Sequence, residues 1–244
     1  MTYAWQWLCS ALFVGQMYLA MPFFALIYAP AALASRTWAF RAIHAYCRWV
    51  RWTARWMIGL RSEIRGTPPE GAALIAAKHQ SFFDIILIVS ACRRPRFIMK
   101  RSLKWAPALG WYAMRIGCVP VDRGKRGQAI AGMVAQVLKE RDDPGQLIIY
   151  PQGTRVAPGA TRPYKIGTGV LYRELGRPCV PAATNVGVFW PRTGIYRKPG
   201  LAVVEFLAPV APGLPVDDFM ADLETSVEGV SNRLMQEAGF SHKG

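Results

Sequence analysis

Hydrophobic positions divide the chain into an N-terminal region without charges and a longer region of short alternating segments. No charged side chain occurs from Ala4 to Ser35, and roughly 20 apolar residues are enough to cross the hydrocarbon core of a bilayer. Pro22 and Pro30 fall inside this run, and proline kinks or interrupts a helix. The pattern therefore predicts a membrane-associated segment that is either one tilted span or a helical hairpin entering one leaflet.

The flanks of the apolar run differ from those of a cleaved secretory signal. Such a signal begins with basic residues and ends at a small-residue cleavage site. No Lys or Arg precedes Ala4, so the signal-peptide interpretation is disfavoured.

A basic and aromatic segment follows the apolar run. Arg41, Arg48, Arg51 and Arg55 recur at helical spacing, with Trp and Tyr residues between them, as expected for a helix with one cationic stripe. Clustered Lys and Arg beside a membrane segment attract anionic lipid headgroups and indicate the cytoplasmic side of the membrane. Trp and Tyr favour the depth of the lipid headgroups. The segment predicts an interfacial helix, and the alternative is an ordinary helix with a solvated cationic face.

Short apolar runs alternate with amphipathic stretches along the rest of the chain. The runs predict buried strands at 72–77, 97–99, 118–121, 147–150, 180–183 and 201–207. The stretches between them predict helices at 82–92, 129–141, 167–175 and 216–237. This alternation indicates an α/β fold with a mixed, largely parallel sheet flanked by helices. We therefore divide the chain into a membrane-associated helical segment at 1–65 and a single domain at 66–244.

Charge and cysteine usage narrow the classes of function. Lys and Arg number 30 against 15 Asp and Glu, a net charge of +15, which suits a basic membrane-surface protein or a nucleic-acid binder. The long uncharged segment makes nucleic-acid binding the weaker alternative, and we expect no nucleic-acid partner. The five cysteines lack any Cys-x-x-Cys or Cys/His ligand spacing, so neither a zinc site nor a disulfide framework is predicted.

His79 is the histidine best placed for chemistry. It follows the predicted strand 72–77, and functional groups gather where strands end in α/β sheets. With Asp84 in the first turn of the next helix, its carboxylate accepts the Nδ1 proton and leaves Nε2 to remove a proton from an attacking hydroxyl. Ser81 and Asp84 also form a capping-box pattern, so a purely structural role for Asp84 is the alternative.

Basic residues at other predicted strand ends indicate an anion site. Tyr150–Arg155 ends one strand, where Gly153 permits an unusual turn with amides directed at an anion and Arg155 suits bidentate phosphate binding. Lys100 and Arg123 follow two further strands. Basic groups at the same ends of successive strands, beside a His–Asp pair, predict one anion-binding active site.

These residues resemble the glycerolipid acyltransferase family, in particular the bacterial 1-acyl-glycerol-3-phosphate acyltransferases. Four blocks stand in the family's order, at 79–84, 117–123, 150–155 and 180–182. The first is His-x4-Asp, and the third is usually Phe-Pro-Glu-Gly-Thr-Arg in that family. The resemblance covers about residues 70–210, and Gln152 departs from it by replacing the usual glutamate.

The resemblance implies transfer of a fatty acyl group from an acyl thioester to the free hydroxyl of a lysophospholipid. His79 would be the base, Asp84 its support, and Gly153 with neighbouring amides the oxyanion donors. The residues implied to bind the acceptor phosphate are Lys100, Arg123 and Arg155. No cofactor and no metal is implied, and the co-substrate is acyl-CoA or acyl carrier protein.

The acceptor implied first is 1-acyl-glycerol-3-phosphate, which would give phosphatidic acid. Gln152 and Thr154 are the predicted acceptor-site residues. Because Gln152 replaces glutamate, the alternative acceptor is a lyso-aminolipid such as lyso-ornithine lipid. The expected location is a bacterial inner membrane, facing the cytoplasm and in contact with anionic lipids.

Overall fold

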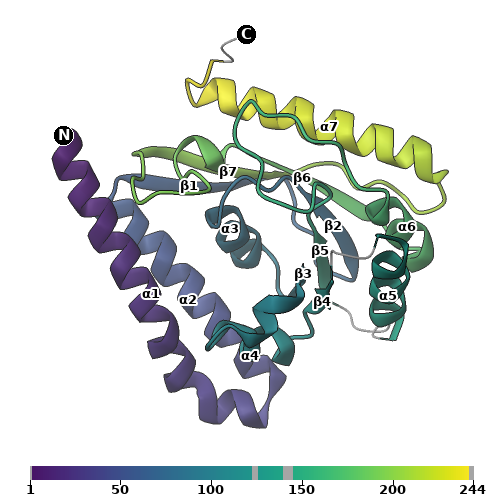
Figure 1. The fold of residues 1–244 in the computed structure, drawn as a ribbon, viewed down its shortest axis with the longest axis horizontal. Helices are drawn as coiled ribbons and strands as arrows, with labels where there is room; N and C mark the ends of the chain where they lie inside the picture. The colour runs from purple at the N-terminus through teal and green to yellow at the C-terminus, as the bar shows by residue number, and fades with distance from the viewer. Residues whose placement is uncertain (1, 123–125, 140–144, 242–244) are drawn as a thin grey trace.

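The computed structural model describes residues 2–122, 126–139 and 145–241, and within these residues a seven-stranded sheet forms the centre of the fold (Figure 1). The strand order is β1-β7-β6-β2-β5-β3-β4. Neighbouring strands are parallel except β6 and β7, which are antiparallel. The strands are β1 (Leu60–Arg65), β2 (Ala73–Ala77), β3 (Pro95–Lys100), β4 (Val119–Val121), β5 (Gln146–Ile149), β6 (Cys179–Thr184) and β7 (Gly200–Phe206). The predicted α/β fold with a largely parallel sheet is confirmed.

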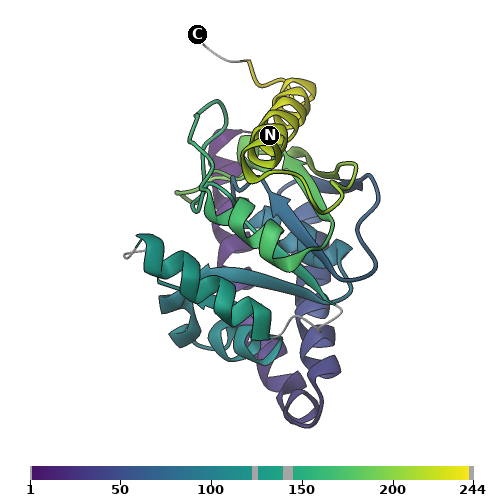
Figure 2. The ribbon, with the colours of Figure 1, turned by 90° about the vertical axis from the view of Figure 1, so that its right-hand side faces the viewer.

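Helices cover both faces of this sheet (Figures 1 and 2). Side chains from α1, α2 and α3 pack on one face, and side chains from α5, α6 and α7 pack on the other. The helices are α1 (Tyr3–Ala34), α2 (Arg36–Met57), α3 (Phe83–Ala91), α4 (Leu109–Arg115), α5 (Arg126–Lys139), α6 (Gly167–Leu175) and α7 (Val216–Glu237), with short 3-10 turns at Arg101–Trp105 and Val186–Val188. Strand alternation explains the layers, because successive side chains of β2 enter the two cores in turn.

One strand and one helix, β1 and α4, were not predicted from the sequence. Residues 60–65, which we assigned to the helical segment, form β1 and pair with β7 at the edge of the sheet. Leu60, Ser62 and Ile64 alternate with Arg61, Glu63 and Arg65, so the charges resembled a continuation of the basic helix. Helix α4 is short and follows Pro107, which left too few turns for a helical period to appear.

The N-terminal apolar run forms one helix and not a hairpin. Helix α1 continues through Pro22 and Pro30 and ends at Ala34, and α2 then runs back along it from Arg36 (Figure 1). Among the described residues, α1 is the one helix long and apolar enough to cross a membrane. The predicted cationic helix is confirmed as α2, whose Arg side chains at 41, 48 and 55 are exposed.

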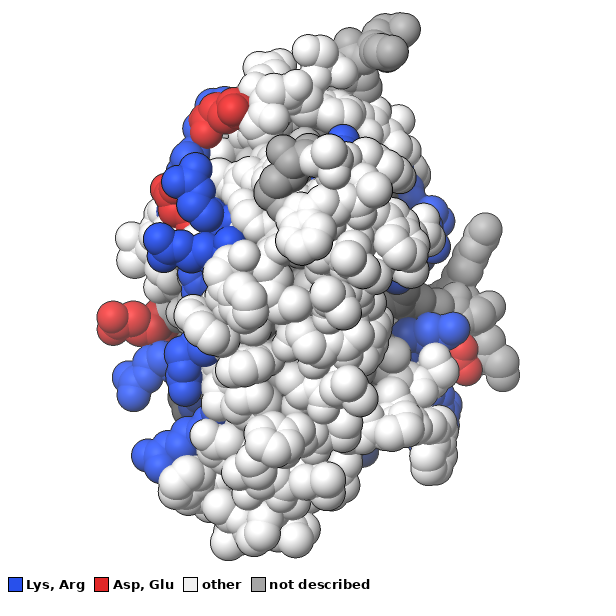
Figure 3. Space-filling model, turned by 90° about the vertical axis from the view of Figure 1, so that its left-hand side faces the viewer, with Lys and Arg blue, Asp and Glu red and all other residues white. Residues whose placement is uncertain are grey.

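Helix α1 has one face in the core and another open to the surroundings. Phe13 and Met17 are buried in the cluster beneath α2 and α3, and the Gln6 amide donates to the carbonyl oxygens of Ile58 and Arg197. The opposite side exposes large apolar side chains, including Leu19 and Leu26. Figure 3 shows this side as a broad uncharged surface bordered by Lys and Arg.

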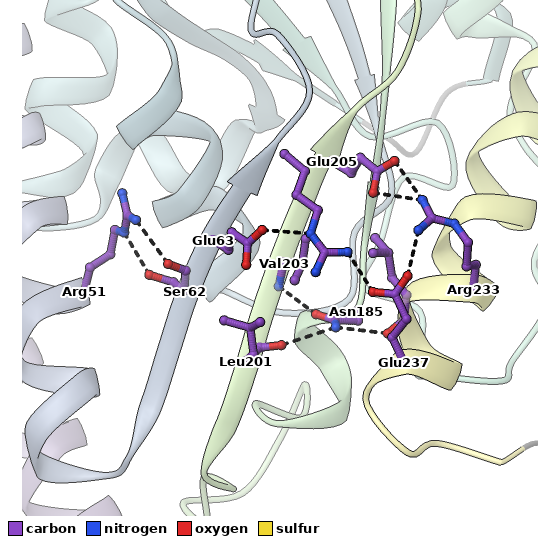
Figure 4. Close-up of polar contacts among 11 residues, drawn as sticks. Arg51, Ser62, Glu63, Asn185, Leu201, Val203, Glu205, Arg233 and Glu237 are labelled. Atoms are coloured by element: carbon purple, nitrogen blue, oxygen red, sulfur yellow. Dashed lines mark hydrogen bonds and ion pairs between the residues drawn. The ribbon is translucent and has the colours of Figure 1, made fainter.

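Helix α7 is fastened to the sheet near its C-terminal end by a chain of ion pairs (Figure 4). Glu237 accepts from Arg65 of β1 and from Arg233 of α7, both at 2.7 Å. Arg233 also pairs with Glu205 of β7 at 2.8 Å. Asn185 adds a bond to the Leu234 carbonyl. These contacts hold the C-terminal end of α7 against β1 and β7.

Candidate active site

The C-terminal ends of β2, β5, β3 and β4 lie at the same edge of the sheet, because these four strands are neighbours and parallel. Each of the predicted site segments therefore begins at this edge. His79 follows β2, Tyr150–Arg155 follows β5, and Lys100 ends β3. Arg123 follows β4 in the sequence but lies outside the described residues.

His79 and Asp84 are in contact. Nδ1 of His79 lies 2.9 Å from Oδ1 of Asp84, and the carboxylate is fully buried whereas the imidazole is 14% exposed. The other carboxylate oxygen, Oδ2, accepts the backbone N–H groups of Gln80 at 2.8 Å and Ser81 at 2.7 Å. Asp84 therefore contacts His79 through one oxygen and holds the turn before α3 through the other.

Tyr150 completes this group, although we did not assign it to the site from the sequence. Its ring stacks on the imidazole of His79 with 3.9 Å between centroids, and its hydroxyl donates to Oδ1 of Asp84 at 3.3 Å. Burial, and then the charge of Asp84, raises the pKa of Tyr150 well above its usual value. The phenol thus stays protonated and acts as a donor. Its place at the end of an apolar strand was the signal that could have identified it.

The turn after β5 has the backbone shape expected from its glycine. Gly153 has φ +69°, and its N–H donates to the Tyr150 carbonyl at 2.8 Å. This amide is engaged within the turn, so the predicted oxyanion role of Gly153 stays a prediction. The exposed Lys165 lies over the turn, with Nζ 2.9 Å from the position that a Cβ on Gly153 would occupy.

The other predicted site residues of this segment, Gln152, Thr154 and Arg155, differ in burial. Thr154 and Arg155 are partly exposed, and Arg155 donates through Nη1 to the Arg192 carbonyl at 3.2 Å. Gln152 is only 2% exposed, and its Nε2 lies 3.4 Å from Oε1 of Glu228 in α7. The structure therefore leaves Arg155 accessible to an anion but turns Gln152 away from the His79 face of the sheet.

An apolar hollow of about 470 Å³ lies close to the loop that carries His79. Its lining includes Tyr3 and Trp7 of α1 and Gly187 and Val188 after β6, and the Gly187 N–H donates to the Gln80 side chain at 2.9 Å. Ligand pockets are typically of this size and apolar lining. The apolar hollow thus lies near a strand edge that carries the His79–Asp84 pair and cationic side chains.

The described residues contain no cluster of side chains suited to binding a metal ion. No group of three or more His, Cys, Asp or Glu side chains comes together there, and the five cysteines are all free thiols. The expectation of a reaction without metal stays a prediction.

A sequence profile of the acyltransferase family matches residues 61–185. The chain belongs to the acyltransferase family. The matched region of this family member includes the His79–Asp84 pair and the whole turn after β5, while α1 and α2 precede it and α7 follows it.

Individual relatives agree with the family assignment. The chain is 28% identical over 160 residues to a 1-acyl-sn-glycerol-3-phosphate acyltransferase of Pseudomonas aeruginosa, covering 65% of the chain and 62% of that relative. It is 31% identical over 175 residues to the human 1-acyl-sn-glycerol-3-phosphate acyltransferase alpha, covering 68% and 61%. The chain therefore spans less than two thirds of the length of either relative.

A solved structure shares the fold. The crystal structure of the 1-acyl-sn-glycerophosphate (LPA) acyltransferase PlsC of Thermotoga maritima superimposes with a TM-score of 0.78 at 18% identity. The superposition covers 94% of this chain and 97% of that one. The shared fold thus extends through the N-terminal helices and α7 as well as through the region that the family profile matches.

Proposed function

We propose that this chain transfers a fatty acyl group from an acyl thioester to the free hydroxyl of a lysophospholipid. The proposed acceptor is 1-acyl-glycerol-3-phosphate and the product phosphatidic acid. The observation that carries the proposal is the bond from His79 to a buried Asp84 at the end of β2, in a chain of the acyltransferase family. The names of the relatives support the choice of acceptor.

In the proposed reaction, Nε2 of His79 removes the proton of the acceptor hydroxyl as its oxygen attacks the thioester carbonyl. The new C–O bond forms, the oxyanion collapses, and the C–S bond breaks. His79 then returns the proton to the leaving thiolate, and Asp84 stabilises the imidazolium between the two steps. These steps need no metal and no acyl-enzyme, and the donor is acyl-CoA or acyl carrier protein.

The acceptor phosphate is proposed to bind at the cationic strand edge. Lys100 ends β3 with an exposed side chain, and Arg155 lies in the turn after β5. Arg123 is the third proposed ligand. Gln152 is buried and directed at Glu228, so its departure from the family's usual glutamate does not favour a lyso-aminolipid head group.

Lipid product analysis with purified protein tests this function. Wild type is expected to acylate lysophosphatidic acid, and His79→Ala is expected to lose that activity with either donor. Lyso-ornithine lipid serves as the competing acceptor in the same assay. Faster acylation of the aminolipid by wild type, with lysophosphatidic acid near background, would replace our acceptor with the alternative.

We also propose that the protein works at a membrane surface, the inner membrane facing the cytoplasm. The uncharged outer side of α1 is bordered by Lys and Arg (Figure 3), and α2 exposes further arginines. This arrangement suits an apolar face entering the bilayer with basic residues at the anionic headgroups.

Two exposed leucines of α1 offer a test that spares the core. Leu19 and Leu26 are 74% and 75% exposed, so Leu19→Gln/Leu26→Gln should weaken flotation with anionic vesicles while preserving the melting temperature. Leu214→Gln, which alters an exposed leucine elsewhere, is the control. Equal flotation of both variants would contradict the membrane proposal. Deleting residues 1–60 is unsuitable, because Phe13 and Met17 belong to the core.

A further inference from the structure

A second set of polar side chains lies behind the His79 site, on the α7 face of the sheet. Lys78 directly follows β2 and precedes His79, and its N–H still pairs with β6 by donating to the Ala182 carbonyl at 2.8 Å. Neighbouring residues of an extended chain point to opposite faces. The Lys78 side chain is nearly fully buried, and its Nζ lies 2.6 Å from both carboxylate oxygens of Glu228. Glu228 belongs to α7, beyond the residues 61–185 that match the family.

Glu228 also contacts the loop between β5 and α6. The Tyr164 hydroxyl donates to Oε1 of Glu228 at 2.9 Å. Gln152 Nε2 donates to the same oxygen at 3.4 Å and to the Arg162 carbonyl at 3.2 Å. Burial, and then the charge of Glu228, raises the pKa of Tyr164, so Tyr164 stays a neutral donor. One carboxylate therefore joins the end of β2 to two points of this loop.

These contacts lie directly behind the residues of the proposed reaction. Lys78 is adjacent to His79, and Gln152 is two residues beyond Tyr150, whose ring stacks on His79. The loop also returns to the base itself, because the Val156 N–H donates to the His79 carbonyl at 2.8 Å. A shift of the loop would therefore change the geometry of His79 and Tyr150.

We propose that Glu228 is a positioning residue for acyl transfer, which supplies from α7 the negative charge that holds the end of β2 and the loop after β5 in place. The proposal rests on the proposed function of the His79 site. Because Gln152 is neutral, the charges of Lys78 and Glu228 balance. A carboxylate at position 152 would repel Glu228, but it would serve Lys78 if position 228 were an amide. The cluster thus accepts one carboxylate at either position, and not two.

Exchanging the amide and the carboxylate tests this rule. We compare full-length Gln152→Glu, Glu228→Gln and the double variant Gln152→Glu/Glu228→Gln in an acyl-CoA and lysophosphatidic acid assay. Each single variant should lower kcat about tenfold with little change in KM, and the double variant should recover to within about threefold of wild type, since contacting residues are non-additive. Glu237→Gln removes another α7 carboxylate, one that pairs with Arg65 and Arg233, and should keep wild-type kcat.

Limited trypsin cleavage gives a measurement that needs no substrate. Arg155 and Lys165 are the trypsin sites of the loop, because Arg162 precedes Pro163 and resists cleavage. Cleavage at these two sites should accelerate about tenfold in each single variant, since it reports local opening, and should return to the wild-type rate in the double variant. If wild type fails to acylate lysophosphatidic acid while cleavage follows this order, the substrate proposal fails and the positioning of the loop stands.

Three results would overturn the proposal. The first is a double variant whose kcat and cleavage losses are the sum of the single losses. The second is a Glu228→Gln variant whose kcat and cleavage rate equal those of wild type. The same conclusion follows if its kcat and cleavage rate change as much as those of Glu237→Gln, in proportion to the fall in melting temperature. The third is failure of both Glu228→Gln and the double variant to fold, because the charge exchange would then not preserve the cluster.

Discussion

The ends of β2 and β5 present different chemistry on the two faces of the sheet. On the α3 face, His79 is partly exposed and rests on Tyr150 and the buried Asp84. On the α7 face, Lys78 and Gln152 are buried against Glu228. The Lys78 ammonium is buried, and it is held by a Glu228 carboxylate that is partly exposed. The same two strand ends therefore carry the proposed base on one face and the proposed support on the other.

On each face one carboxylate accepts hydrogen bonds from several donors. Substitutions on the two faces are nevertheless expected to have different effects. Asp84 accepts two backbone amides, an imidazole and a phenol. Glu228 accepts an ammonium, a phenol and an amide. Changes on the α3 face should act on the chemical step, and changes on the α7 face should act through the loop.

The largest expected effect comes from His79→Ala. Loss of a general base typically lowers turnover by about 10²–10⁴-fold. Because the imidazole bonds to the buried Asp84 and stacks on Tyr150, some loss of stability is expected as well. Phosphatidic acid formation and melting temperature are measured together. His44→Ala is the control, because His44 lies in α2, where its Nε2 is 3.3 Å from the Arg93 carbonyl oxygen. A folded His79→Ala protein with near-normal turnover would remove His79 from the mechanism.

Asp84→Asn should affect both turnover and stability. An amide has one acceptor oxygen, so either the Gln80 and Ser81 amides or the His79 and Tyr150 donors would face its NH2 group. A buried unsatisfied donor costs about 1–3 kcal/mol, and a misoriented imidazole should lower turnover by about 10²-fold or more. Denaturant unfolding and kcat are the measurements. Lower stability with unchanged kcat would assign Asp84 to holding the turn before α3 alone.

The α3 face was largely predictable from sequence because its parts are close along the chain. His79 and Asp84 are five residues apart, and the strands that bring Lys100 and Tyr150–Arg155 to one edge are apolar runs. The α7 face was not predictable, because Lys78 and Glu228 are 150 residues apart. The contact of Gln152 with Glu228 was not predictable for the same reason, since Glu228 comes from a helix that local patterns cannot place.

The membrane segment shows a similar limit. Its apolar composition predicted association with a bilayer, but the two prolines did not determine whether it forms one helix or a helical hairpin. Packing of Phe13 and Met17 into the core, and the Gln6 bonds to Ile58 and Arg197, hold α1 against the domain as one helix. These contacts join residues that are far apart in the sequence.

A smaller effect is expected from Gly153→Ala. The positive φ of Gly153 costs other residues about 1–2 kcal/mol, and the new Cβ would displace only the flexible end of Lys165. Gly176→Ala is a matched control, because Gly176 has φ +57° at the end of α6 with open space around it. Both variants should lose similar stability, and Gly153→Ala alone should lower kcat, by a few fold. Equal kcat values would show that the turn does not support the reaction.

Tyr150→Phe should produce the smallest effect and separates the two faces most directly. The change removes the 3.3 Å bond to Asp84 but keeps the ring against His79, and such a bond is worth about 1 kcal/mol. We expect kcat to fall a few fold with trypsin cleavage unchanged. Tyr164→Phe removes the equivalent bond to Glu228 and should accelerate cleavage of the loop after β5.

Because the pKa of Tyr150 is raised by burial and by Asp84, the ratio of wild-type to Tyr150→Phe turnover should stay constant from pH 6 to pH 9, about the range in which a normal phenol is protonated. A ratio that changes with pH across this range would mean that Tyr150 exchanges a proton during the reaction.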